Sequence, residues 1–182
     1  MCAICFEAKL FSIDTTTLLL LPKSVSAKLP SRGMVVVEGT LNGFPFQSAL
    51  EPDGRGSHWL RCTSAMIAAT HTHDGDTVTL MIAPSQACPE PTVPKDLHDA
   101  LSVDPKVFTL WKSVKPMARW DWIRWISATK NPETRKKRIM VELSKLKNGE
   151  KRPCCFNRSM CCDTSVSKNG MLREPNGTYF TK

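Results

Sequence analysis

The sequence lacks the long apolar runs, glycine-rich loops and serine elbows that mark several large protein classes. No hydrophobic stretch approaches the roughly 20 residues that a membrane-spanning helix needs, and the leucine run at 18–21 stops at Pro22. Neither a Gly-x-Gly-x-x-Gly loop nor a Gly-Lys-Ser/Thr loop occurs. A Gly-x-Ser-x-Gly nucleophile elbow is also missing. These absences argue against membrane spans, nucleotide cofactors and α/β-hydrolase chemistry.

An export signal is also missing from the amino end, where residues 1–7 carry no basic residue and include the acid Glu7. We therefore expect a cytoplasmic protein. Hydrophobic residues make up 41% and charged residues 23% of the chain, which is ordinary for a globular protein. Eight cysteines are many for a cytosolic chain, but 182 residues can bury a core without disulfides, so we expect reduced thiols.

Charge is distributed unevenly along the chain, whose net charge is +8. Residues 1–93 carry a net charge of −2 and residues 94–182 a net charge of +10. Segment 87–94 contains three prolines, which suit an extended linker, and it lies where the net charge changes from negative to positive. The predicted organisation is a β-barrel domain at 1–87, a linker at 88–94, a helical domain at 95–150 and an irregular cysteine-containing tail at 151–182.

The first half has the hydrophobic pattern of short β-strands. Apolar residues alternate with polar ones from Phe6 onward, the period of a half-buried strand. Asn42-Gly43 is a strong hairpin signal, because both central residues of a type I′ turn need positive φ. Further strands are expected at 15–21, 34–41, 44–50, 59–62 and 77–83, with short helical segments at 22–29 and 64–70. This pattern predicts a small closed barrel or a sandwich.

The second half has the hydrophobic pattern of helices. Asp104-Pro105 and Asn131-Pro132 each combine a capping side chain with a first-turn proline. Four helices are expected, beginning near Pro94, Asp104, Pro116 and Asn131, the last with a buried stripe at Ile139, Leu143 and Leu146. The predicted fold class is therefore α+β, with a small barrel followed by a small all-α domain.

A basic segment at 112–152 holds 13 Lys and Arg against 4 acids. Such a cationic face is typical of phosphate-binding surfaces, yet it also suits the solvated side of an ordinary amphipathic helix. Nucleic acid or another polyanion is the partner that the first interpretation implies. The candidate contacts are Arg135, Lys136, Lys137 and Arg138.

Three tryptophans stand beside two arginines in the third predicted helix, at 116–126. Aromatic and cationic side chains form stacking platforms for single strands, but this helix is apolar on two sides, which favours a buried position. We interpret it as the central helix of its domain. Its arginines, Arg119 and Arg124, are then expected to pair with Asp121 or Glu133.

Four tail cysteines offer two alternatives, zinc binding or uncoordinated thiols. Four thiolates suit tetrahedral zinc, but adjacent cysteines differ from the paired C-x-x-C pattern, and the thiols could instead be redox-active. No other cofactor is predicted. The candidate ligands are Cys154, Cys155, Cys161 and Cys162.

The polar stretch 51–59 is the most turn-rich part of the predicted barrel and is our candidate rim of a ligand pocket. His71 and His73 precede a turn and are interpreted as surface residues. An enzyme that uses the 53–58 loop or the tail thiols is a third functional alternative. The candidate ligand-binding residues are Asp53, Arg55, Ser57, His58 and Trp59.

Several motifs in both halves resemble a known two-domain bacterial arrangement. In the first half these are Gly39–Phe46, Leu50–Leu60 and Gly75-Asp76; in the second they are Pro94–Leu97, Ala118–Ile123, Trp125-Ile126, Glu133–Arg135 and Arg138-Ile139.

The first half resembles a β-barrel domain of unknown function, and the second resembles the YdeI/OmpD-associated, or bacteriocin-protection, domain. The resemblance extends to about Phe156. It implies a split-barrel-like fold followed by helices, and the family's name suggests a role in stress or bacteriocin tolerance. Our leading hypothesis is a non-enzymatic cytoplasmic binding protein. Polyanion binding is the alternative, and the sequence assigns no oligomeric state.

Overall fold

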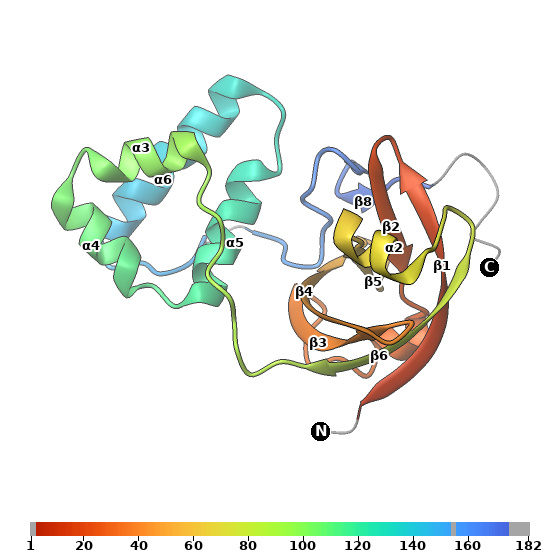
Figure 1. Ribbon diagram of the computed structural model, residues 1–182. Helices are drawn as coiled ribbons and strands as arrows, with labels where there is room; N and C mark the ends of the chain where they lie inside the picture. The colour runs from red at the N-terminus through yellow and green to blue at the C-terminus, as the bar shows by residue number, and fades with distance from the viewer. Residues whose placement is uncertain (1–2, 154–155, 175–182) are drawn as a thin grey trace. The chain divides into compact units, whose positions relative to one another are not determined.

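The chain forms two compact units in the computed structural model, which describes residues 3–153 and 156–174 (Figure 1). Residues 3–87, 158–161 and 165–174 make up the barrel unit. Residues 88–153, 156–157 and 162–164 make up the helical unit. The α+β fold class expected from the sequence is confirmed.

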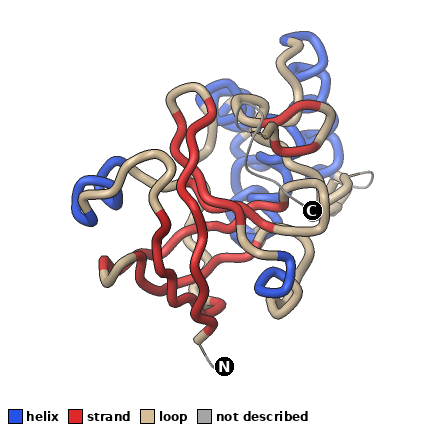
Figure 2. The backbone as a smooth tube through the Cα atoms, turned by 90° about the vertical axis from the view of Figure 1, so that its right-hand side faces the viewer, coloured by secondary structure: helices blue, strands red, loops and turns tan. Residues whose placement is uncertain are grey.

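Six antiparallel strands close into a barrel in the order β1-β2-β5-β4-β3-β6. Figure 2 shows these strands curling around a common interior. Of the two predicted architectures, barrel and sandwich, the barrel is the one that forms. The strands are β1 (Ile4–Ile13), β2 (Thr16–Leu20), β3 (Val35–Leu41), β4 (Phe44–Pro52), β5 (His58–Arg61) and β6 (Thr77–Pro84).

The barrel interior is filled by apolar side chains that alternate with outward-facing polar ones. Phe6, Ala8 and Leu10 of β1 face inward together with Val78, Leu80 and Ile82 of β6, and the two strands pair directly. The β3–β4 hairpin turns at Asn42-Gly43, whose φ angles of 46° and 85° confirm the predicted turn.

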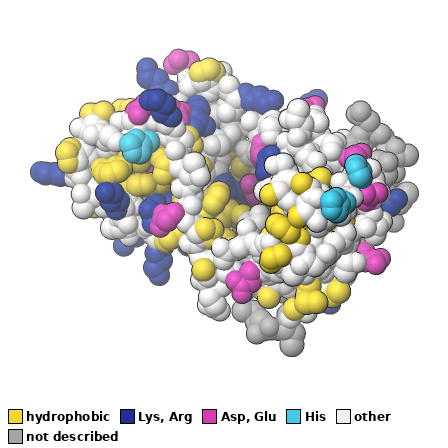
Figure 3. All heavy atoms as spheres, in the orientation of Figure 1, with side chains coloured by type: hydrophobic (Ala, Val, Ile, Leu, Met, Phe, Trp, Pro, Cys, Tyr) yellow, Lys and Arg dark blue, Asp and Glu magenta, His cyan; other side chains and the backbone are white. Residues whose placement is uncertain are grey.

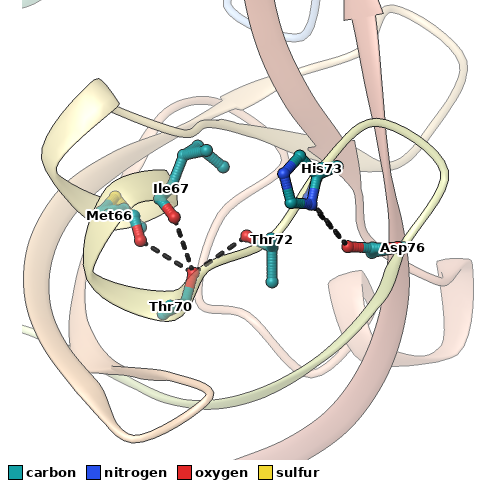
Figure 4. Close-up of polar contacts among 6 residues, drawn as sticks. All are labelled: Met66, Ile67, Thr70, Thr72, His73 and Asp76. Atoms are coloured by element: carbon teal, nitrogen blue, oxygen red, sulfur yellow. Dashed lines mark hydrogen bonds and ion pairs between the residues drawn. The ribbon is translucent and has the colours of Figure 1, made fainter.

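Two short helices pack against the barrel core. Helix α1 spans Lys23–Ser26, and α2 spans Ser64–Thr70, where Met66 and Ile67 pack against the barrel core. The Thr70 hydroxyl lies 2.8 Å from the Met66 carbonyl and 2.9 Å from the Thr72 hydroxyl, as Figure 4 shows. These contacts fix the end of α2.

The connection after α2 carries the two histidines that the sequence placed on the surface, and both are exposed. His71 has a left-handed φ of 51° at the helix end. The His73 backbone N–H donates to the Asp76 carboxylate at 2.8 Å, so the segment is a tight turn into β6.

The helical unit contains α3 (Lys95–Ser102), α4 (Pro105–Ser113), α5 (Pro116–Ser127) and α6 (Pro132–Lys147). The Asp104 and Asn131 side chains accept hydrogen bonds from Lys106 N and Thr134 N, which confirms both predicted caps. Helix α6, the longest of the four, packs against each of the other three. The tryptophan-rich α5 buries residues on both of its sides, as the sequence predicts, although α6 rather than α5 is the helix that packs closely against all the others.

The predicted partner of Arg119 is also corrected. Its guanidinium lies 2.6 Å from Glu90 rather than beside Asp121 or Glu133. Arg124 is buried with its guanidinium 5.4 Å from the centre of the Phe156 ring. Glu90 of the predicted linker therefore forms an ion pair with a helix of the helical unit.

One acidic residue interrupts the apolar stripe of α6. Glu142 lies between Ile139 and Leu146 and is fully buried. Neither carboxylate oxygen has a hydrogen-bond partner among the residues described. Burial alone raises the pKa of Glu142 to about 8, because the interior disfavours the charged form.

The tail contributes an unpredicted hairpin to the barrel unit. Strands β7 (Ser167–Lys168) and β8 (Met171–Leu172) pair across an Asn169-Gly170 turn with φ angles of 54° and 76°. Cys161, Val166 and Leu172 pack on Phe11, Ile13, Leu18 and Trp59, which form an apolar patch outside the main barrel core. The region interpreted as irregular therefore docks through a short element of regular structure.

Within residues 3–153 and 156–174, no helix is both long enough and apolar enough to cross a membrane.

Candidate functional site

The loop between β4 and β5 is tightly constrained and carries Arg55 at its tip. The Asp53 carboxylate accepts hydrogen bonds from the backbone N–H groups of Arg55 at 2.7 Å and Ser57 at 2.8 Å. Gly54 and Gly56 have φ angles of +79° and +93°, a region that L-residues rarely adopt. The sequence therefore builds a loop in which a buried carboxylate and two glycines fix the backbone beneath Arg55.

Neighbouring segments hold the same loop from outside. Arg32 donates to the Gly56 carbonyl at 2.9 Å, and the buried Ser57 hydroxyl donates to the Leu21 carbonyl at 2.7 Å. Each contact links the loop to a different part of the barrel. The position of Arg55 is thus set by the barrel framework.

His58 is fully buried, and each of its two ring nitrogens forms a hydrogen bond within the barrel unit. Nε2 lies 2.8 Å from the Gly33 carbonyl, which can only accept, so Nε2 donates. In the neutral ring Nδ1 is then the acceptor, and it receives the Ser26 hydroxyl at 2.7 Å. This serine–histidine pair is shielded from solvent and ties β5 to α1.

A pocket of about 440 Å³ opens beside Arg55. The β7–β8 hairpin supplies most of the opposite wall, with charged, amide and apolar groups. The lining residues are Arg55, Lys168, Asn169, Met171, Leu172, Arg173 and Glu174.

Backbone contacts lock the two walls together. Leu172 N donates to the Asp53 carbonyl at 2.8 Å and so joins the hairpin to the Arg55 loop, while Cys161 N donates to the Gly170 carbonyl at 2.8 Å and holds the hairpin to the rest of the tail. A Cβ atom at Gly54 would lie 2.1 Å from the Gly170 oxygen, so only glycine permits this approach. The pocket is therefore built from two chain segments more than a hundred residues apart.

The charges lining the pocket are three cations and one carboxylate. Arg173 is held by Asp14 at 2.6 Å and also donates to the Ser165 carbonyl. Arg55 is paired with Glu174. Lys168 is exposed and forms no ion pair within the part of the chain that the structure describes. The pocket thus offers a net positive environment suited to an anion.

The sequence-predicted ligand residues divide into two groups. Arg55 lines the pocket, whereas Asp53, Ser57 and His58 are buried and position the loop. Trp59 is 1% exposed and packs beneath the tail. Sequence reasoning missed Lys168 and Glu174, although the Asn169-Gly170 dipeptide is a hairpin signal that could have indicated their wall.

A second, smaller pocket of about 240 Å³ is lined by residues of β1, including Phe11, and by residues 20–22 at and after the end of β2. Its side chains are mainly apolar, with Glu7 and Lys9 of opposite charge among them. It lacks the concentration of cations that surrounds Arg55.

The four basic residues of α6 also divide into two groups. Arg135 makes a two-pronged contact with Asp96, at 2.6 and 3.0 Å, which holds the pKa of that carboxyl below its ordinary value. Arg138 donates to the Trp125 carbonyl and lies 5.3 Å from the centre of its ring. Lys136 and Lys137 are exposed. On the face that Figure 3 shows, Lys and Arg side chains are spread around the helical unit without forming one patch.

The zinc prediction concerns four cysteines, of which Cys154 and Cys155 lie outside the described residues. Cys161 and Cys162 are buried. Among the residues that are described, no three His, Cys, Asp or Glu side chains gather as metal ligands would. Zinc at these cysteines stays a prediction.

Comparison with known families gives two matches that follow one another along the chain. Residues 6–82 match a domain of unknown function, DUF1905. Residues 90–149 match the family described as "Bacteriocin-protection, YdeI or OmpD-Associated", also called OmdA. No curated protein matches the chain. The two matched segments coincide with the barrel strands and with α3–α6.

Proposed function

The chain belongs to the DUF1905 and OmdA bacteriocin-protection families, with a DUF1905 domain followed by an OmdA domain. On this premise we propose that the protein is a non-enzymatic binding protein for small anions. The binding site is the pocket beside Arg55. The family description supports a role in bacteriocin tolerance. A role in stress tolerance and a cytoplasmic location are further parts of the proposal.

The observation that carries this proposal is the fixed position of Arg55 on one wall of a 440 Å³ pocket. Asp53 and the flanking glycines hold its backbone, so binding does not require the loop to become ordered. A guanidinium in a preformed pocket recognises carboxylate or phosphate oxygens through paired hydrogen bonds. The volume suits a small molecule.

Binding is favoured over catalysis because the nearest groups with catalytic chemistry are committed elsewhere. His58 uses both ring nitrogens internally and has no exposed surface, so a substrate could not reach it without opening the barrel. The buried Ser57 hydroxyl donates to a backbone carbonyl. These contacts support a structural role for both residues.

Arg55→Met is expected to weaken anion binding by about tenfold or more, because a charge-assisted hydrogen bond contributes about 1.5–3 kcal/mol. NMR titration with phenylacetate and with phenyl phosphate measures the effect at the Gly54 and Gly170 amides. Lys28→Met, which removes an exposed charge two residues after α1, is the matched control and should leave affinity unchanged. Equal affinity of Arg55→Met and the wild type for both probes would exclude this site.

Polyanion binding through α6 is the second candidate, favoured by the exposure of Lys136 and Lys137 within a strongly basic segment. The double variant Lys136→Ala/Lys137→Ala should reduce the slope of log affinity for duplex DNA against log salt by about 1.8, since each phosphate contact contributes about 0.9. Lys23→Ala/Lys28→Ala, which removes one exposed lysine on α1 and one just after it, is the control. An unchanged slope would exclude α6 as the contact surface.

A further inference from the structure

The carboxylate of Glu174 already forms an ion pair with Arg55, whose guanidinium is the group that the proposed ligand would bind. Glu174 contacts Nη1 of Arg55 directly, and both residues line the pocket. Their side chains are 42% and 52% exposed, so the pair lies at the pocket mouth in contact with water. A pair of this kind is weak and exchanges readily.

The other charged groups at the site differ from this pair in how firmly they are held. Arg173 is fixed by Asp14 and by the Ser165 carbonyl, so its charge is neutralised within the barrel unit. The described part of the chain offers Lys168 no acidic partner. Displacing Glu174 would therefore leave Arg55 and Lys168 as two cations open to one incoming anion.

The remaining lining indicates the shape of that anion. Met171 is 41% exposed and pairs with Lys168 across the β7–β8 hairpin, so an apolar side chain stands beside a cation in the pocket lining. Apolar surface next to a cation favours a ligand with a short apolar body attached to its charged group. Glu174 itself has this construction, with two methylene groups carrying a carboxylate.

We propose that Glu174 is an internal competitor that mimics the ligand, and that the pocket binds small carboxylates with a short apolar body. This inference rests on the proposed function, because it requires Arg55 to be the ligand contact. Binding exchanges one carboxylate for another on the Arg55 guanidinium, with Lys168 adding a second charge contact. No bond is formed or broken.

Glu174→Gln tests the competition directly, because glutamine keeps the size of the side chain and removes its charge. Phenylacetate affinity, measured by NMR titration at the Gly54 amide, should increase about twofold to fivefold, the range expected for losing a weak surface ion pair. Glu7→Gln is the matched control. It removes an exposed acid from β1, where Glu7 pairs with Thr79 of β6 and does not line the Arg55 pocket, so affinity should be unchanged. Adding Arg55→Met to Glu174→Gln should cancel the gain.

The outcomes separate this inference from the function on which it rests. If Arg55→Met abolishes binding while Glu174→Gln matches the wild type, the internal competition is wrong and the anion site stands. If phenyl phosphate binds more tightly than phenylacetate to Glu174→Gln, the carboxylate class is wrong. If 2-phenylethanol, the neutral probe, binds as well as phenylacetate, recognition of charge is wrong. If neither anion binds the wild type or Glu174→Gln, both the inference and the proposed function fail.

Discussion

Gly39→Ala is expected to destabilise the barrel by about 3–5 kcal/mol, or to prevent its folding, because a side chain at this position has no space. An alanine Cβ would lie 1.9 Å from the Met81 carbonyl oxygen and 2.9 Å from the Ile82 Cα. Both atoms belong to the backbone of β6, which pairs with Gly39 on one side while Phe46 of β4 pairs on the other. The strands would have to separate and lose ladder hydrogen bonds.

Urea denaturation followed by the amide signals of Leu41 and Leu80 measures this effect in the full chain. Gly43→Ala is an instructive control, because a Cβ there has nothing within 4 Å and only the positive φ of +85° opposes it. Its expected cost is about 1–2 kcal/mol. A loss below about 1 kcal/mol for Gly39→Ala would mean that the strand spacing is not fixed by this glycine.

The helical unit is expected to lose stability as pH rises from about 5 to about 8, the reverse of ordinary acid denaturation. Burial raises the pKa of Glu142 from 4.5 to about 8 in the folded protein. The folded state therefore holds this proton more tightly than the unfolded state does. The stabilisation is complete below the unfolded pKa and is lost as pH rises through the folded one, at up to roughly 1.4 kcal/mol per pH unit.

Glu142→Gln should remove most of this slope, and Glu142→Leu should stabilise the unit above pH 8 by about 2–4 kcal/mol, because leucine suits the apolar stripe. The indole NMR signals of Trp111 and Trp122, both buried in this unit, report its unfolding. Glu133→Gln, an exposed acid in the first turn of the same helix, should keep the wild-type slope. A wild-type slope in Glu142→Gln would assign the pH dependence to other groups.

Much of the secondary structure follows from local sequence patterns. The alternation from Phe6 onward predicts β1, and Asn42-Gly43 predicts the β3–β4 hairpin, because these signals depend on neighbouring residues alone. The Asp104 and Asn131 caps are local in the same sense. The Asn169-Gly170 hairpin carried an equally local signal, but its two-residue strands lack a readable hydrophobic pattern.

The candidate site was predicted only in outline. The sequence singled out the 53–59 stretch because it is polar and rich in turns, and Arg55 does line a pocket. Pattern reasoning could not separate Arg55 from His58, since both are polar residues in one short segment. Their different roles arise because His58 enters β5 and is buried, whereas Gly54 and Gly56 turn Arg55 outward.

The sequence by itself determined the order and type of the barrel strands and of the four helices α3–α6, since hydrophobic period, caps and turn residues act over a few neighbouring positions. Only the tertiary structure decided which charged groups are available. It paired Arg135 with Asp96, buried Glu142 without a partner and brought Lys168 and Glu174 to Arg55 from more than a hundred residues away. The physical reason is that a side chain's charge state and accessibility depend on what packs around it, and those neighbours are distant in the chain.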